Sequence, residues 1–156
     1  MIAPCAIPCR RLLLQPSGEQ LRFEYQLDYG AGSPIGVHTF SGVLSPRFYL
    51  DQVSPARTFV TDQEAEKLQA SGIAQHVTER DLLVFGADGP INNELRFSNE
   101  CARHKALDLL GDLALTGTNL LGKLIARKSG HQMNGELARL IQEKLADSSS
   151  HPRKVA

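Results

Sequence analysis

An imidazole and two carboxylates follow one another at intervals of four residues in the run RHKALDLLGDL, residues 103–113. Side chains four apart lie on one face of a helix, so His104, Asp108 and Asp112 are expected to form a polar stripe with Lys105 at its edge. A histidine and a carboxylate one turn apart can fill two coordination positions of a zinc ion. Because a catalytic zinc usually has three protein ligands, the stripe alone predicts an incomplete hydrolytic site.

A second histidine, His131, ends the run KSGH, where a tight turn is expected to open another helix. The plainer interpretation of His131 is a solvated residue at a helix start. The plainer interpretation of His104 with Asp108 is an exposed ion pair worth about 0.2–0.5 kcal/mol. Asp112 argues against the latter, because a third aligned acid is unusual on a helix that serves packing alone. Gly111 beside it costs about 1 kcal/mol of helix propensity, so we expect some group to approach the helix backbone closely there.

Length and charge limit the class of protein. The chain has 156 residues, the size of one domain, and its 42% of hydrophobic residues are enough for a core. The 17 basic and 17 acidic residues give a formal net charge of zero, which argues against a generic binder of nucleic acid or membrane surfaces. No apolar stretch approaches the roughly 20 residues of a membrane span, so stable membrane insertion is not expected.

Cysteine usage and the first residues bear on the cellular compartment. Cys5, Cys9 and Cys101 are an odd number with no regular framework, which favours a reducing compartment. The spacing of Cys5 and Cys9 matches a zinc knuckle poorly. Residues 1–14 place their charges after the apolar part and contain prolines, which is unlike a signal peptide. The cytoplasm is therefore the expected location.

Patterning along the chain predicts alternating strands and helices. Residues 21–29 alternate between apolar and polar side chains, which is typical of a half-buried strand, and a turn should return the chain in an antiparallel strand over residues 37–43. Thr61 and Glu64 can form a capping box, which predicts a helix up to about Ala70. Further helices are expected over about residues 46–52, 99–116 and 132–145, and further strands over residues 82–86, 95–97 and 123–128.

This order of elements predicts an α+β fold, in which a small mixed or antiparallel sheet has helices packed on one face. Residues 1–16 are expected to be a loose N-terminal segment, residues 17–146 the domain, and residues 147–156 a disordered polar tail. The stripe and the KSGH turn both fall inside the domain.

Three separated motifs resemble a known enzyme family. They are SPARTF (54–59), ELRFSNECARHKALDLLGDLALTG (94–117) and KSGHQMN (128–134), and their order and spacing also fit. Residues 21–145 thereby resemble the second, C-terminal domain of the zinc-dependent UDP-3-O-acyl-N-acetylglucosamine deacetylases. These enzymes carry out the committed step of lipid A synthesis, and hence of lipopolysaccharide synthesis, in Gram-negative bacteria. The family has two similar α+β domains packed together, and the resemblance covers only the second.

The resemblance implies a role for each polar residue of the site. His104 and Asp108 correspond to two of the three zinc ligands, and zinc would polarise the acetamide carbonyl and activate water. His131 corresponds to the histidine that stabilises the oxyanion and protonates the leaving amine. Asp112 corresponds to the acid that orients this histidine and keeps it charged, which agrees with the effect of a carboxylate on an imidazole. Thr58 corresponds to a threonine that donates a hydrogen bond to the developing oxyanion.

Three further positions correspond to substrate contacts. Phe59, Lys105 and Lys128 match residues of the family that contact the sugar and the UDP diphosphate. The implied substrate is a UDP-sugar that carries an acyl chain, and the implied reaction is hydrolysis of its N-acetyl group.

Two departures from the family's pattern bear on activity. The third zinc ligand and the general-base glutamate lie in a histidine-glutamate-histidine motif of the family's first domain, and this sequence contains no such motif; its other histidines are His38, His76 and His151. Without that base, water activation should lose about 10²–10⁴-fold, and a site with two ligands should bind zinc weakly. The glycine-rich segment before the acyl-tunnel strand is replaced by AQHVTERDLLVF, residues 74–85, which leaves the acyl length open.

Three hypotheses follow from the sequence. In the first, the chain is the C-terminal half of a deacetylase and a separate chain supplies the first domain; this hypothesis predicts an exposed apolar face. In the second, it is a non-catalytic domain that binds a nucleotide-sugar or a protein partner without hydrolysis. In the third, it is a different metallohydrolase with the same H-x-x-x-D spacing, which the agreement of three motifs argues against. The sequence favours the first hypothesis.

Overall fold

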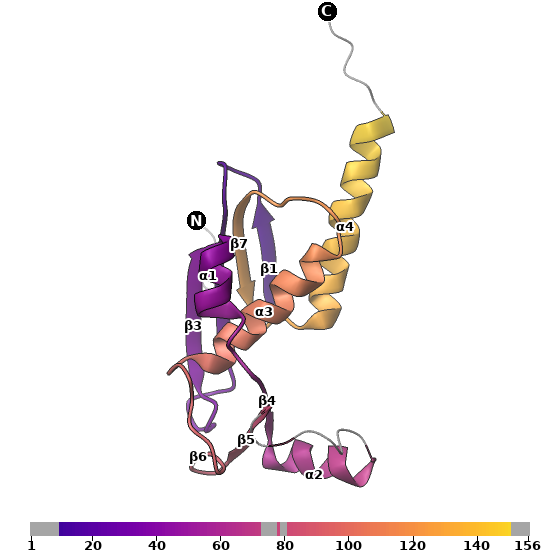
Figure 1. Cartoon of the computed structure of the whole chain (residues 1–156). Helices are drawn as coiled ribbons and strands as arrows, with labels where there is room; N and C mark the ends of the chain where they lie inside the picture. Colours follow the sequence, from indigo (N-terminus) through magenta and orange to yellow (C-terminus); the bar gives the residue numbers. More distant parts are fainter. Residues whose placement is uncertain (1–9, 73–77, 79–80, 151–156) are drawn as a thin grey trace, which may run out of the picture.

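The chain folds around a four-stranded mixed sheet (Figure 1). The computed structural model describes residues 10–72, 78 and 81–150. The strand order is β1–β7–β2–β3, with β1 (Arg11–Gln15), β7 (Gly122–Arg127), β2 (Leu21–Asp28) and β3 (Val37–Val43). The central strands β2 and β7 are parallel, whereas β1 is antiparallel to β7 and β3 is antiparallel to β2.

One face of this sheet is apolar and carries helices. The alternation predicted for β2 is confirmed, because Leu21, Phe23, Tyr25 and Leu27 are buried. Figure 1 shows three helices on the same side of the sheet: α1 (Pro46–Phe48), α3 (Glu100–Ala114) and α4 (His131–Ser150). A π-helical turn, η1 (Tyr49–Val53), continues α1. The fold is therefore α+β with helices on one face, as the sequence predicts.

The helix α3 is fixed by apolar side chains at helical spacing. Ala102, Ala106, Leu109 and Leu113 are at most 2% exposed and pack in the core against the sheet. Burying each leucine side chain stabilises the fold by about 1.5–3 kcal/mol, so the rotation of α3 about its axis is strongly determined. This rotation places the predicted polar stripe along one margin of the buried face.

A second, smaller sheet lies at one end of the molecule (Figure 1). Its strand order is β4 (Thr58–Thr61), β5 (Leu82–Gly86) and β6 (Gly89–Pro90), and α2 (Asp62–Ala70) packs against β4 and β5. The predicted capping box is confirmed: Glu64 N donates to Thr61 Oγ1, and Thr61 N donates to the Glu64 carboxylate over 2.8 Å. Within the described part of the chain, no helix is long and apolar enough to cross a membrane.

The structure corrects several expectations. Residues 11–15 are strand β1 rather than part of a loose segment, because they pair with β7, which lies far along the chain. The strands form two sheets rather than one, residues 95–97 are not a strand, and α4 continues through Ser150 into the expected tail. Residues 1–9 and 151–156, with Cys5, Cys9 and His151, lie outside the described residues, as do His76 and part of the 74–85 segment.

The expected close approach to a glycine occurs at Gly122 instead of Gly111. A Cβ atom at Gly111 would meet nothing within 4 Å, so no described group of this chain approaches it. Gly122 has φ +135°, and a Cβ there would lie 2.2 Å from the carbonyl oxygen of Gln15, in the neighbouring strand β1. Only glycine fits this conformation and this contact without strain.

Alanine at these two glycines should have opposite effects. We expect Gly122→Ala to lower the free energy of unfolding by about 1–3 kcal/mol, because the backbone of β1 cannot move aside from the new methyl group. Gly111→Ala should raise it by about 0.5–1 kcal/mol, because alanine favours an exposed helix position. Urea unfolding followed by circular dichroism measures both, and equal stability of the two variants would contradict the prediction.

Candidate functional site

The polar stripe predicted on α3 exists, and its first two members contact each other. His104 Nε2 lies 3.4 Å from Asp108 Oδ1, and both side chains are only 12% exposed. Lys105 Nζ donates to the other carboxylate oxygen, Oδ2, over 2.9 Å. Burial lowers the pKa of His104 and outweighs the opposing effect of Asp108. His104 is therefore a neutral imidazole near neutral pH, the form that binds metals.

The His104–Asp108 pair suits two positions of a zinc site. With zinc bonds of about 2.0–2.1 Å and tetrahedral angles, neighbouring ligand atoms lie about 3.4 Å apart, which is the separation of His104 Nε2 and Asp108 Oδ1. His104 Nδ1 is buried without a hydrogen bond of good geometry, although the Ala56 backbone is near enough to raise the pKa of the ring. Among the described residues, no group of three or more His, Cys, Asp or Glu side chains could hold a metal ion. His104 and Asp108 therefore fit two positions of a zinc site, and a further ligand would have to come from elsewhere.

The second histidine lies beside the same stripe. His131 begins α4, and its Nδ1 is 2.8 Å from Asp112 Oδ2. Its Nε2 is 3.8 Å from Asp108 Oδ2, so the two histidine–aspartate pairs adjoin each other. A carboxylate at Nδ1 favours the tautomer with a proton there, which leaves Nε2 directed away from Asp112. The side chain of His131 is 70% exposed and accessible to a ligand.

The sequence did not assign a role to Asn134, which the structure places in the site. Asn134 Nδ2 donates to Asp112 Oδ2 over 2.8 Å, and the residue is 1% exposed. It lies three residues after His131, so both side chains face the same carboxylate from one turn of α4. That spacing in KSGHQMN was the available signal. Asn134 fixes Asp112 from the side opposite to solvent.

A cation-lined pocket of about 370 Å³ adjoins the stripe. Arg10, Lys105 and Lys128 contribute its positive charges. Lys128 Nζ lies 3.4 Å from Asp28 Oδ2, and a hydrogen bond from the Gly30 N–H, together with Lys128, holds the pKa of Asp28 below its usual value. Lys128 has φ +51°, an uncommon conformation for a side chain other than glycine and one that recurs at functional sites. Asp28 also lines the pocket, so three basic side chains face one carboxylate there, and this excess of positive charge favours an anionic ligand.

The other two predicted residues come from β4. Phe59 is 8% exposed, and its ring meets the His104 ring edge to face at a centroid distance of 6.0 Å. Lys105 Nζ lies 5.7 Å from the centre of the Phe59 ring, and Tyr29 packs on the same ring at 5.8 Å. Thr58 is exposed at the start of β4. The structure thus brings Phe59 against the metal-ligand candidate and places Thr58 next to it in the chain.

The family model described as LpxC, UDP-3-O-acyl N-acetylglycosamine deacetylase, matches residues 9–143. The chain belongs to this deacetylase family. Curated relatives named UDP-3-O-acyl-N-acetylglucosamine deacetylase include one from Solibacter usitatus, 35% identical over 85% of this chain, and one from Leptospira biflexa, 37% identical over 86%. A third, from Chlamydia caviae, is 36% identical over 81%. The matches span 44%, 44% and 46% of the relatives' own lengths, so this chain covers less than half of these deacetylases.

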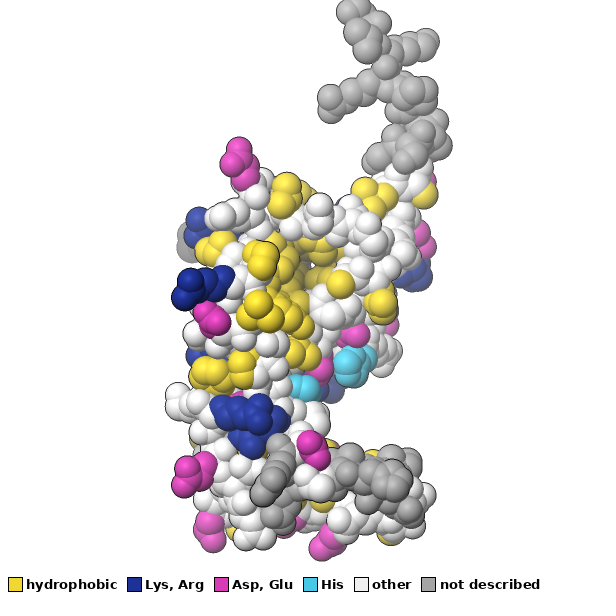
Figure 2. Space-filling model, viewed as in Figure 1, with side chains coloured by type: hydrophobic (Ala, Val, Ile, Leu, Met, Phe, Trp, Pro, Cys, Tyr) yellow, Lys and Arg dark blue, Asp and Glu magenta, His cyan; other side chains and the backbone are white. Residues whose placement is uncertain are grey.

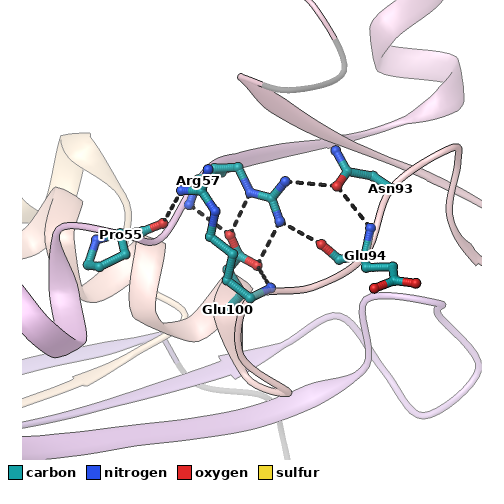
Figure 3. A network of polar contacts seen from close by, with 6 residues as sticks. Pro55, Arg57, Asn93, Glu94 and Glu100 are labelled. Carbon is teal, nitrogen blue, oxygen red and sulfur yellow. Dashed lines mark hydrogen bonds and ion pairs between the residues drawn. The ribbon is translucent and has the colours of Figure 1, made fainter.

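A buried ion pair underlies the site of this deacetylase-family domain (Figure 3). The Arg57 guanidinium donates to both oxygens of Glu100, through Nε at 2.9 Å and Nη2 at 3.1 Å, and to Asn93 Oδ1 and the Glu94 carbonyl. The backbone N–H of Arg57 and that of Arg96 also donate to Glu100. Glu100 is 0% exposed, and its pKa is lowered because these hydrogen bonds outweigh the effect of burial. Sequence patterns gave no sign of this pair, which joins residues 43 positions apart.

The lowered pKa of Glu100 predicts loss of stability in acid. Its folded-state pKa lies below the ordinary value of 4.5, so its stabilising effect is complete above that pH and disappears as the pH falls through the folded-state value. The stability difference between the wild type and Glu100→Gln should therefore narrow between pH 6 and pH 3, as measured by urea midpoints. Glu66→Gln, at an exposed position on α2, is the matched control and should follow the wild type. A difference that stays constant with pH would contradict the assignment.

Proposed function

We propose that this chain is the half of a zinc-dependent UDP-3-O-acyl-N-acetylglucosamine deacetylase that carries two zinc ligands and the general acid. It would hydrolyse the N-acetyl group of its substrate, in the cytoplasm, together with the family's first domain. One observation carries the proposal: the His104–Asp108 pair and the His131–Asp112 pair adjoin each other, with His131 Nε2 only 3.8 Å from Asp108. A metal-ligand pair next to a histidine oriented by a carboxylate combines Lewis-acid and general-acid groups that can together hydrolyse an amide.

Zinc is the proposed cofactor, held by His104 Nε2 and Asp108 Oδ1. When bound, it supplies Lewis-acid polarisation of the acetamide carbonyl. His104 supports this role because burial keeps its imidazole neutral. Lys105 holds Asp108 Oδ2 over 2.9 Å, which orients the other carboxylate oxygen, Oδ1, toward His104. The third ligand and the general base are assigned to the first domain.

His131 is the proposed general acid. Asp112 accepts a hydrogen bond from Nδ1–H and orients the imidazole, while Asn134 holds the same carboxylate oxygen in place. The exposed Nε2–H can then stabilise the oxyanion and deliver its proton to the leaving nitrogen as the C–N bond breaks. The Thr58 hydroxyl is proposed as a further oxyanion donor, and such a donor contributes about 10²–10³-fold to the rate.

The substrate fits the cation-lined pocket. Arg10, Lys105 and Lys128 offer a positive lining for the diphosphate of a UDP-sugar, in the part of the molecule that also holds the stripe. Phe59 packs between Lys105 and His104, so its ring is placed to contact the sugar beside the reacting acetamide.

The partner that supplies the first domain is proposed to cover the helical face. Hydrophobic side chains gather there (Figure 2), and a groove of about 410 Å³ runs between α3 and the segment before β7. Leu115 and Leu121 are 79% and 47% exposed, and Leu140 on α4 is 47% exposed. Relatives of more than twice the matched length support a further domain as the occupant, and the sequence predicted an exposed apolar face without saying where it lies.

A non-catalytic nucleotide-sugar-binding or partner-binding domain is the alternative. It is favoured by the absence of a three-ligand metal group among the described residues, together with the cation-lined pocket. The two functions differ in their dependence on metal, because hydrolysis needs His104 whereas binding in the pocket does not.

Zinc titration separates the two functions. We expect the chain alone to bind zinc weakly, to bind it tightly when the first domain of a related deacetylase is added, and then to release acetate from the UDP-sugar. His104→Ala should abolish the tight binding and the acetate release, whereas His38→Ala, on β3 outside the site, should preserve both. UDP-sugar binding that is indifferent to zinc and to His104→Ala, without acetate release, would favour the alternative. Tight stoichiometric zinc in the chain alone would overturn the half-site assignment.

A further inference from the structure

The Arg57–Glu100 ion pair connects the two elements that carry the proposed machinery. Arg57 directly precedes Thr58 and Phe59 at the start of β4, and Glu100 lies one helical turn before His104 on α3. β4 belongs to the small sheet, whereas α3 packs on the four-stranded sheet, and no strand is shared between the two sheets. The ion pair therefore sits where the oxyanion side of the site meets its metal side.

We propose that Arg57 and Glu100 are positioning residues, which set the placement of Thr58 and Phe59 relative to His104 and Asp108. Neither side chain is proposed to touch substrate or metal. This inference rests on the proposed function, because it assumes that β4 and α3 serve one reaction.

The atoms that take part in the hydrogen bonds indicate that the pair sets the position of β4 on α3, in addition to holding the two elements together. Glu100 Oε1 accepts from both the backbone N–H and Nε of Arg57, at 3.0 Å and 2.9 Å, so the main chain entering β4 is fixed along with the side chain. Glu100 Oε2 accepts from Arg57 Nη2 and from the backbone N–H of Arg96. A planar guanidinium and a planar carboxylate joined by two parallel bonds allow little rotation or sliding. An apolar pair of the same volume could fill the space but could not fix the main chain.

The remaining guanidinium bonds extend this control to the loop before α3. Nη1 donates to Asn93 Oδ1 and Nη2 to the Glu94 carbonyl, while Arg96 Nη1 returns to the Pro55 carbonyl, two residues before Arg57 (Figure 3). The loop on one side and the entry to β4 on the other are therefore tied to the same carboxylate. A shift of β4 along α3 would break several charge-assisted bonds at once.

Such control matters because the proposed oxyanion donor and metal ligands act on one carbonyl group. Catalytic groups must be held within about 0.5 Å of the productive geometry, and a displacement of about 1 Å can reduce the rate about 10²-fold. The Phe59 ring against His104, at 6.0 Å between centroids, is the direct contact that reports this placement.

The test replaces the ion pair by apolar residues and measures two properties of the variant: whether it folds, and whether the Phe59 ring still contacts the His104 ring. Removing both charges together avoids an unpaired buried charge, so the double variant Arg57→Met/Glu100→Leu is expected to fold. Its melting temperature and its β2–β7 contacts, observed by NMR on the whole 156-residue chain, report folding. Nuclear Overhauser contacts between the Phe59 and His104 rings report the placement of β4 relative to α3. We expect the folded double variant to lose at least about half of this ring–ring intensity.

Arg103→Met is the matched control. Arg103 is also an arginine anchored by several hydrogen bonds, to Asn99 and Gln52, and it directly precedes His104. Since the bonds to Gln52 connect α3 to η1 rather than to β4, the Phe59–His104 contact in Arg103→Met should remain at wild-type intensity. Arg57→Lys is the second test variant: it keeps the charge but loses the planar fork, so the ring–ring contact should weaken while the fold is retained. This single variant decides the question if the double variant does not fold.

Unchanged ring–ring contacts in the folded double variant, or in Arg57→Lys, would overturn the proposal. An equal loss in Arg103→Met would do the same, because it would show that any damage to α3 has this effect. With the first domain added, the double variant should lower kcat about 10²-fold with KM changed much less. If the wild type itself shows no deacetylation, the proposed function fails, whereas the NMR result still decides the placement of β4.

Discussion

The parallel pairing of β2 with β7 decides where the functional groups of this domain meet. Two parallel neighbours need a crossover connection, and here the crossover contains the small sheet and α3. Because parallel strands end at the same edge, the residues that follow β2 and β7 lie together, and Asp28 meets Lys128 across 100 positions of sequence. The chain then turns into α4 and delivers His131 to the margin of α3. The cation-lined pocket therefore forms beyond the ends of two parallel strands, a common place for ligand sites.

Local patterns predicted the elements well, because the signals that they depend on are local. Alternation of apolar and polar residues predicted β2, and spacing by four residues predicted the polar stripe on α3. The capping box of Thr61 and Glu64 predicted the start of α2. The missed features depend on partners distant in sequence. The five residues of β1 carry no clear strand pattern, and their pairing with β7 is what makes them a strand. Sequence alone also cannot show that Gly122, and not Gly111, has a neighbouring backbone in contact.

The same distinction holds for the site. Spacing on α3 and the KSGH turn indicated His104, Asp108, Asp112 and His131, and the resemblance to the family gave them candidate roles. The structure brings these four side chains together. Arg10 in the pocket and the Arg57–Glu100 pair beside β4 have no pattern of their own and needed the fold. Asn134 had a signal in its spacing from His131, but its contact with Asp112 became evident only in the structure. The proposed roles of Thr58 and of zinc stay predictions.

The two histidine–aspartate pairs of the site differ in their exposure to solvent. His104 is 12% exposed and is kept neutral by burial, which suits a ligand that gives a lone pair to a metal. His131 is 70% exposed, with its Nδ1 2.8 Å from Asp112 Oδ2, so its ring is accessible to a ligand that enters from solvent. The margin of α3 thus carries two imidazole–carboxylate pairs that differ in burial. The buried pair is proposed for coordination, and the exposed pair, which His131 of α4 completes, is proposed for proton transfer.

The division into two sheets has a consequence for how the domain opens. The four-stranded sheet and the helices packed on it supply most of the core, together with the stripe and His131. Among the described residues, the small sheet adds only Phe59, Leu83 and Phe85 to that core, has one two-residue strand, and is tied to α3 by the Arg57–Glu100 network. Segments with fewer buried contacts open at lower free energy than the global unfolding transition. We therefore expect the small sheet to open at lower free energy than the four-stranded sheet, so that its amide hydrogens exchange with solvent while those of β2 and β7 remain protected. In such an opening the proposed metal ligands on α3 would stay assembled, and only the proposed oxyanion donor on β4 would move away.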